Sequence, residues 1–196
     1  MSAETLMSVL VGIGLSAACG FRVFAPLLVM SLASRSGHLA LSAGFEWIAT
    51  YPALLALSVA TAAEIAGYYI PLVDHLLDLI AGPAAVVAGI TAMASSVLGV
   101  SPFLRWSLAI IAGGGIAATV QTVTGVARVT STTTTAGIAN PVVSTAEAAG
   151  ATVFSFLAVA VPLVCLAAIL ALLTLIWWPG RALLRRLMNL LGLSQQ

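Results

Sequence analysis

Two charged residues, Arg22 and Glu64, each stand alone within a long run of apolar residues. A charge near the centre of a bilayer costs about 2.5 to 3.5 kcal/mol on insertion scales, so both are expected to have a partner or to face water. A buried carboxylate can bind a cation or carry a proton, and an arginine can meet an anionic group. Both residues are therefore candidates for an ion or solute pathway. The alternative is a structural salt bridge between Arg22 and Glu64 that only fixes helix packing.

The second half of the chain holds a comparable pair, Arg128 and Glu147. The sequence Thr-Ala-Glu-Ala-Ala-Gly at 145–150 resembles Ala-Ala-Glu-Ile-Ala-Gly at 62–67, and in each half an arginine lies just after a glycine. Two copies separated by three crossings would have opposite orientations, which is the inverted-repeat plan of many transporters. The alternative is a chance recurrence in an alanine-rich chain.

If the repeat is real, one half-site pairs Arg22 with Glu64 and the other pairs Arg128 with Glu147. The uncharged polar residues near the second pair would complete the pathway. The candidate pathway residues are Arg22, Glu64, Arg128, Glu147, Asn140 and Gln121.

Another group of possible ligands follows Pro71. Asp74 and Asp78 are four residues apart and share a helical face, and His75 is three residues from Asp78. These three could contribute to a metal site, but they lack a fourth ligand, and charges at a membrane interface need no metal to explain them. The sequence has no nucleophile with its base, no phosphate-binding glycine loop and no Cys-x-x-Cys motif, so we expect neither an enzyme nor a cofactor.

The composition explains what must position these residues. Of 196 residues, 61% are hydrophobic and 7% are charged, against roughly a quarter charged in an ordinary soluble domain. The formal net charge is only +1, and all seven basic residues are arginines, so we expect no nucleic-acid partner. Cys19 and Cys165 lie deep in apolar runs and are expected to be packing residues. These features predict an all-α, polytopic helical bundle in a lipid bilayer.

A transmembrane helix needs about 20 apolar residues, and five windows satisfy this requirement. They cover residues 6–33, 51–71, 79–100, 106–127 and 148–178. The first window contains Gly20 and Pro26 around Arg22, which predicts a broken helix there, because proline removes a backbone donor and glycine loosens the helix. The last window is expected to tilt or bend near Pro162.

A threonine-rich segment, residues 128–141, lies between the last two windows. It is expected either to form an exposed loop that ends in a turn at Asn140-Pro141 or to line a wet cavity. Gln121 and the neighbouring threonines favour a polar interior.

The arginines indicate the orientation, since short cytoplasmic loops are rich in Lys and Arg. With the N-terminus outside, Arg35, Arg105 and the tail arginines lie inside, whereas Glu4 lies outside. We predict one transmembrane domain over residues 1–178, with possible repeat halves 5–80 and 103–178. An amphipathic tail, residues 179–196, would lie on the cytoplasmic surface.

These motifs resemble the bacterial membrane family called domain of unknown function 4126. The resemblance is carried by the glycine-flanked Arg22 before Pro26, Glu64 before Pro71, the Asp74 and Asp78 pair, Arg128, Asn140-Pro141 and Glu147. It implies a multi-pass protein of the bacterial inner membrane with no established activity. Similar proteins often have an Asp-Lys pair before the proline that follows the glutamate, whereas this chain has Tyr68, Tyr69 and Ile70 there.

Together these features favour a small membrane transporter or channel-like protein that moves an ion or small solute. We expect a homodimer, because five helices make a thin wall around a pathway. The alternative is a structural or accessory subunit of a membrane complex, and a third possibility is an enzyme that acts on lipid.

Overall fold

The part of the chain that the structure describes is built from helices joined by short loops. This computed structural model describes residues 2–174, except for the side chains of residues 71, 72 and 75. In chain order the helices are α1 (Ala3–Cys19), α2 (Phe24–Arg35), α3 (Tyr51–Gly67), α4 (Pro71–Ser96), α5 (Pro102–Leu108), α6 (Gly115–Thr135) and α7 (Asn140–Ala160). A 3-10 turn, η1 (Glu46–Ala49), precedes α3, and a π-helical segment, η2 (Ala109–Gly114), joins α5 to α6. A further helix, Pro162–Thr174, follows α7. The prediction of an all-α fold is confirmed for these residues.

Three helical segments are long and apolar enough to cross a membrane. They are Leu76–Ser96, Pro102–Thr135 and Asn140–Ala160. Shorter apolar helices accompany them, including α1, α2 and α3. These helices agree with a membrane bundle, whereas the number of five spans stays a prediction.

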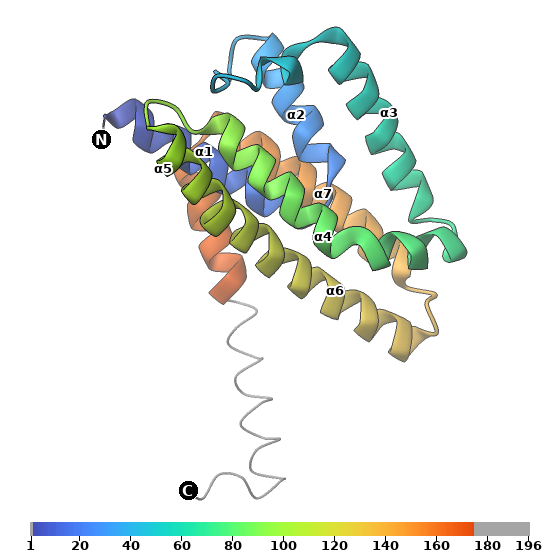
Figure 1. Cartoon of the computed structure of the whole chain (residues 1–196). Helices are drawn as coiled ribbons and strands as arrows, with labels where there is room; N and C mark the ends of the chain where they lie inside the picture. The colour runs from blue at the N-terminus through green and yellow to red at the C-terminus, as the bar shows by residue number, and fades with distance from the viewer. Residues whose placement is uncertain (1, 175–196) are drawn as a thin grey trace, which may run out of the picture.

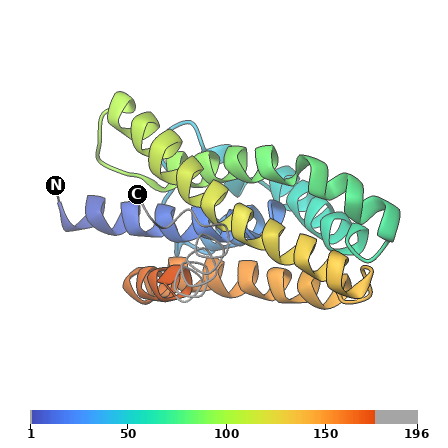
Figure 2. The ribbon, with the colours of Figure 1, turned by 90° about the horizontal axis from the view of Figure 1, so that it is seen from below.

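Helix α1 forms the centre of the bundle. It lies between α7 on one side and α4 with α6 on the other (Figures 1 and 2). The side chains of Leu15 and Cys19 are completely buried, and Cys165 is buried against the same core, as expected of packing cysteines. The hydroxyl of Ser16 donates to the carbonyl oxygen of Gly89 at 2.8 Å, so this polar atom of the central helix is satisfied within the bundle.

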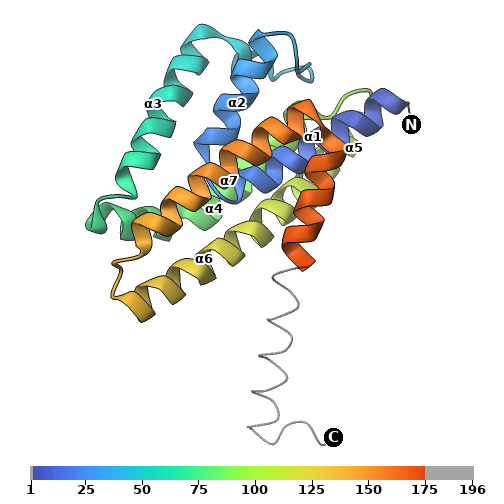
Figure 3. The same cartoon turned by 180° about the vertical axis from the view of Figure 1, so that it is seen from behind.

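The predicted first span is two helices rather than one. Helix α1 ends at Cys19, α2 starts at Phe24, and the chain turns sharply between them (Figures 1 and 3). This confirms the helix break predicted between Gly20 and Pro26. Pro26 lies in the first turn of α2, where its missing N–H leaves no intrahelical bond unmade.

The N-terminal part of α1 and the loop that follows α2 lie at the same end of the bundle. The amide of Leu98 donates to the hydroxyl of Ser8 in α1 at 3.0 Å. In the loop after α2, the hydroxyl of Ser42 donates to the carbonyl of Ala94 at 2.7 Å. Both contacts are made with the C-terminal end of α4 and the turn that follows it.

Arg105, just beyond that turn, also contacts the loop after α2: it donates to the carbonyl of Ala43 at 3.2 Å. The start of α1, the loop after α2 and the start of α5 therefore lie near one another. The predicted orientation, with the N-terminus outside and Arg35 and Arg105 inside, stays a prediction.

The later helices extend beyond their apolar windows. Helix α4 begins at Pro71 rather than at residue 79, α6 continues to Thr135, and α7 begins at Asn140 rather than at residue 148. The chain leaves the helical conformation at Val161, next to the predicted bend at Pro162. The predicted tail, residues 179–196, lies outside the residues that the structure describes.

The threonine-rich segment is the last part of α6 and not a loop, so that alternative is wrong. Several of its hydroxyls donate to the backbone carbonyl four residues earlier: Thr130 to Val126, Thr133 to Val129, Thr134 to Thr130 and Thr135 to Ser131. This bonding within the helix satisfies the hydroxyls without a neighbouring element. A polar sequence can therefore continue an apolar helix, and the chain turns only at residues 136–139.

Glycines allow α4 to contact the α5–α6 helix at very short range. A β-carbon added to Gly89 would lie 2.5 Å from the Ala117 β-carbon and 2.7 Å from the Gly113 carbonyl oxygen. Gly113 in turn could not accept a β-carbon without meeting Gly89. The glycines therefore serve backbone packing, as is typical of membrane helices.

We predict that Gly89→Ala lowers the stability of the bundle by about 1 to 3 kcal/mol, because the new methyl group would overlap backbone atoms that cannot rotate away. Thermal unfolding in detergent measures the loss. Gly115→Ala is the matched control, since an added β-carbon there meets nothing within 4 Å. Equal melting temperatures for the two variants would contradict the close-packing explanation.

Candidate functional site

The strongest ion pair in the bundle joins α6 to α7. Arg128 donates from Nε to both carboxylate oxygens of Glu147, at 3.0 and 3.1 Å, and its Nη2 also bonds to Glu147 Oε2. Both side chains are almost fully buried. The bidentate geometry gives this pair both strength and a fixed orientation.

Helix α4 contributes two more carboxylates to Arg128. Its Nη1 lies 2.7 Å from Asp74 Oδ1 and 3.5 Å from Asp78 Oδ1. The other oxygen of Asp74 accepts from the Asn140 amide at 3.2 Å. Asp74 and Asp78 therefore both face Arg128, and the described residues contain no group of three His, Cys, Asp or Glu side chains that could hold a metal ion. The side chain of His75 is not among those described.

Arg22 joins the same cluster from the break between α1 and α2. Its Nη2 lies 3.2 Å from Glu147 Oε2 and donates to the Ser144 carbonyl at 2.9 Å. Its guanidinium lies 3.7 Å from the centre of the Tyr68 ring, and that of Arg128 lies 4.2 Å from the same ring. Glu147 thus binds both arginines, and the two predicted half-sites form one cluster.

Glu64 has a different partner from the one predicted. Its carboxylate accepts from the backbone amides of Val23 at 2.8 Å and Phe24 at 3.1 Å, which are the first amides of α2. The predicted salt bridge between Glu64 and Arg22 is therefore wrong, although the two charges are close enough to interact. The cause is the helix break: α2 has no capping side chain of its own at Val23, and its free N–H groups attract a carboxylate.

Two nitrogens of Arg22 have no hydrogen-bond partner within the part of the chain that the structure describes. These are Nε and Nη1, and the residue as a whole is only 2% exposed. The buried hydroxyl of Thr61, one turn before Glu64 on α3, also has none there. Donors left unpaired in this way cost about 1 to 3 kcal/mol each, so the position is one where a solvent or solute acceptor would be stabilised.

The described side chains of the cluster carry an excess of negative charge. Their four carboxylates and two guanidinium groups give a formal charge of −2 when all are ionised. They are Glu64, Asp74, Asp78, Glu147, Arg22 and Arg128. Such an excess in a bundle of apolar helices favours the uptake of a proton or another cation.

A groove between α4 and α6 reaches this cluster. It has a volume of about 340 Å³ and is lined by Asp78, Gln121, Gly125, Arg128, Val129, Thr132 and Thr133. Thr132 and Thr133 of the threonine-rich segment line this groove, whereas the wet cavity stays a prediction. Gln121 is a wall residue of the groove, away from the contacts of Arg128 with the carboxylates. Asn140 lies deeper, between Asp74 and Ser131.

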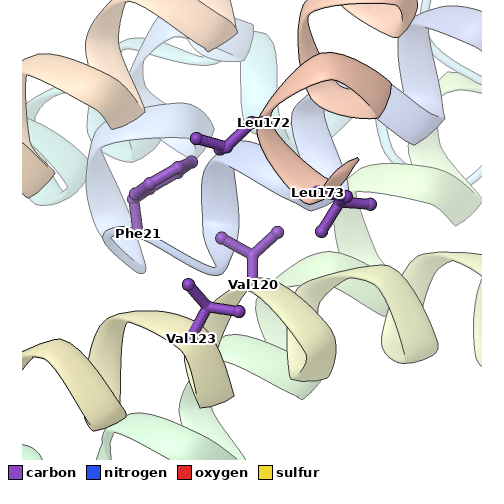
Figure 4. Close-up of a pocket in the computed structure, with 5 residues that line it drawn as sticks. All are labelled: Phe21, Val120, Val123, Leu172 and Leu173. Atoms are coloured by element: carbon purple, nitrogen blue, oxygen red, sulfur yellow. The ribbon is translucent and has the colours of Figure 1, made fainter. Parts of the chain in front are cut away.

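A second cavity is smaller and purely apolar. Its volume is about 50 Å³, and its lining side chains are those of Phe21, Val120, Val123, Leu172 and Leu173 (Figure 4). It offers no hydrogen-bonding side chain, so a polar ligand would gain nothing there. The groove is therefore the better candidate for access to the charged cluster.

The sequence analysis missed two members of the cluster, Tyr68 and Ser144. Tyr68 follows Glu64 by four residues and Ser144 precedes Glu147 by three, so each shares a helical face with a candidate carboxylate. That three- or four-residue spacing is the sequence feature by which Tyr68 and Ser144 could have been identified. The role of Ser144, whose hydroxyl accepts from Arg128 at 3.0 Å while its carbonyl accepts from Arg22, depends on the approach of three helices.

We predict that Glu147→Gln destabilises the bundle by about 3 to 5 kcal/mol, because the change leaves two buried arginines without their shared carboxylate. Unfolding of the purified protein in detergent measures this loss. Glu46→Gln, the same change on an exposed glutamate of η1, should alter stability by less than about 0.5 kcal/mol. A Glu147→Gln protein as stable as Glu46→Gln would show that the cluster does not hold the helices together.

The comparisons with known proteins agree with the sequence motifs. The model of one family, described as a domain of unknown function (DUF4126), matches residues 9–181. No curated protein and no solved structure matches the chain. The matched region contains all six charged residues of the cluster and nearly the whole described bundle, and the chain therefore belongs to the DUF4126 family.

Proposed function

We propose that this protein is a small membrane transporter or channel-like protein that moves an ion or small solute through the charged cluster. In this proposal α3, α4, the continuous α5–α6 helix and α7 cross the bilayer, and the helix that begins at Pro162 adds a further apolar element. Helices α1 and α2 form a re-entrant pair that ends at Arg22. The membrane is the bacterial inner membrane, and two copies form a dimer around the pathway.

The observation that carries the proposal is the pair of unpartnered nitrogens on Arg22. A purely structural ion pair is expected to satisfy its buried donors. Arg22 instead has two nitrogens without a partner in the described chain, and the Thr61 hydroxyl, one turn before Glu64 on α3, also has none there. A water or solute in transit would supply the missing acceptors.

The broken first helix supplies the element that could move. In transporters with discontinuous helices, the ends of half-helices meet the solute near the middle of the membrane. Here the amides at the start of α2 meet Glu64. Protonation of Glu64, or a cation bound to it, would weaken this cap and release α2 from α3. That change would open the break beside Arg22 and couple ion binding to access.

The internal repeat stays a prediction. Helices α3 and α7, which carry Glu64 and Glu147, run in opposite directions, as an inverted repeat requires (Figure 1). Helices α1 and α6, which precede them in the two halves, run in the same direction (Figure 1). The transport proposal therefore depends on the joined cluster and does not require the duplication.

A non-transporting structural subunit is the second candidate. It is favoured by the complete pairing of Arg128, whose three nitrogens all contact acceptors, and by the cap that Glu64 provides to α2. In that case the charges would serve only to fix the register of α1, α4, α6 and α7.

We predict that Glu64→Gln abolishes ion flux and leaves the protein folded. A glutamine can still accept from one amide of α2, so the loss of stability should be only about 1 kcal/mol. The neutral amide cannot take up a proton or attract a cation. The measurement is flux of protons, sodium, potassium or methylammonium into liposomes that contain the purified protein, compared with protein-free liposomes.

The matched control is Glu46→Gln, which should retain the flux of the unaltered protein. If Glu64→Gln unfolds without a separable flux defect, the carboxylate is structural. If the unaltered protein moves none of these ions faster than protein-free liposomes, the subunit alternative is favoured.

A further inference from the structure

The groove between α4 and α6 has the form of a binding site. On α6 its lining residues recur every three or four positions from Gln121 to Thr133, so they make one continuous stripe on the helix. Asp78 faces them from α4. The volume of about 340 Å³ lies within the range of small-molecule pockets.

The one arginine in the groove is already occupied. Nε and Nη2 of Arg128 bind Glu147, and Nη2 also donates to Ser144. Nη1 is shared between Asp74 and Asp78. An anion entering the groove would therefore have to displace a carboxylate that is bound within the protein, which is unfavourable.

The other polar groups of the groove offer mainly acceptor atoms. The Thr133 hydroxyl donates its hydrogen to the Val129 carbonyl, which leaves the lone pairs of its oxygen available. The Thr132 hydroxyl donates to Asn140 Oδ1 and accepts from Asn140 Nδ2 at 3.1 Å, so its oxygen keeps one further lone pair. Gln121 can turn its carbonyl oxygen inward. The Asp78 side chain is 37% exposed, in contrast to the buried carboxylates behind it. These acceptors match a positively charged ligand.

The charge behind the groove acts in the same direction. Apart from Asp78, the described side chains of the cluster comprise three carboxylates and two guanidinium groups, and their formal charge of −1 lies in a bundle of low polarity. Clefts with low-dielectric walls focus such a field and raise the local concentration of counter-ions. A cation would be attracted both by the groove and by the cluster that it reaches.

We propose that the groove between α4 and α6 is a cation-binding site, with Asp78 as its charged ligand and Gln121, Thr132 and Thr133 as its neutral acceptors. Its ligand is an inorganic monovalent cation or a small protonated amine. The inference rests on the proposed function, because it assigns the class of solute that enters the same cluster. Binding can be measured without transport, so the two can fail separately.

The test uses thiol labelling of the full-length protein in liposomes. Cys19 and Cys165 are first replaced by alanine, and Thr133→Cys is introduced into the groove. Its reaction rate is measured with a cationic trimethylammonium methanethiosulfonate and with an anionic sulfonate methanethiosulfonate. Thr134→Cys is the matched control, since Thr134 is an exposed neighbour at the same depth and is not part of the groove.

We expect the ratio of cationic to anionic rates to be several-fold higher for Thr133→Cys than for Thr134→Cys. Adding Asp78→Asn should reduce the ratio at Thr133→Cys to that of the control. Equal ratios at the two positions, or faster reaction with the sulfonate in the groove, would overturn the proposal.

Protection from labelling identifies the kind of cation without relying on Asp78→Asn being folded. At equal ionic strength, slower labelling of Thr133→Cys in methylammonium chloride than in sodium chloride indicates a protonated amine. The reverse order indicates an inorganic cation, and equal rates in both salts and in choline chloride count against a site. A charge preference without flux would refute transport alone, whereas flux without a charge preference would refute the cation site alone.

Discussion

The carboxylate of Glu147 joins α6, α7 and the break after α1 through buried ion pairs. It accepts from Arg128 on α6 and from Arg22 at the break after α1, while it is itself carried by α7. Through Arg128 the same network reaches Asp74 on α4. Lipid tails are as apolar as leucine side chains, so membrane helices gain little specificity from burial alone. A shared carboxylate, which binds in only one geometry, fixes the relative positions of these four elements.

The broken first helix follows from the same need to satisfy polar groups away from water. A helix that ends inside a membrane leaves backbone N–H groups without partners, which costs several kcal/mol per group in hydrocarbon. Glu64 meets this need at the start of α2. The break can therefore lie in the middle of the bundle, and Arg22 is carried into the cluster from there. Gly20 allows the close approach, because a β-carbon there would lie 2.5 Å from the Val120 side chain.

Neutral polar residues are accommodated by local bonding. The threonines of α6 bind the carbonyls of their own helix, and Asn140 is held between Ser131 and Asp74. Among the described residues, the buried polar atoms without a partner are Nε and Nη1 of Arg22, the Thr61 hydroxyl and Nε of Arg105. Arg22 is the one of these residues that belongs to the charged cluster, which the groove between α4 and α6 reaches at Arg128.

The sequence alone predicted the class of the protein and four charged residues of its candidate site. Length, hydropathy and the rarity of charge predicted a helical membrane bundle, because backbone groups in hydrocarbon permit little else. The isolated charges Arg22, Glu64, Arg128 and Glu147 marked the cluster, because an unpaired charge is too costly to keep without a role. Glycine and proline around Arg22 predicted the break, since both act on the local backbone.

Only the tertiary structure decided which of these residues meet. Pairing depends on where α2 turns and on the depth at which α4 and α7 pass Arg128, and neither is encoded in local spacing. In the structure, Glu64 accepts hydrogen bonds at the start of α2, and both arginines form ion pairs with Glu147. The structure also shows that α2 runs back toward the end of the bundle where α1 begins. Hydropathy could not reveal this, because an apolar segment has the same composition whether it crosses the bilayer or turns back within it.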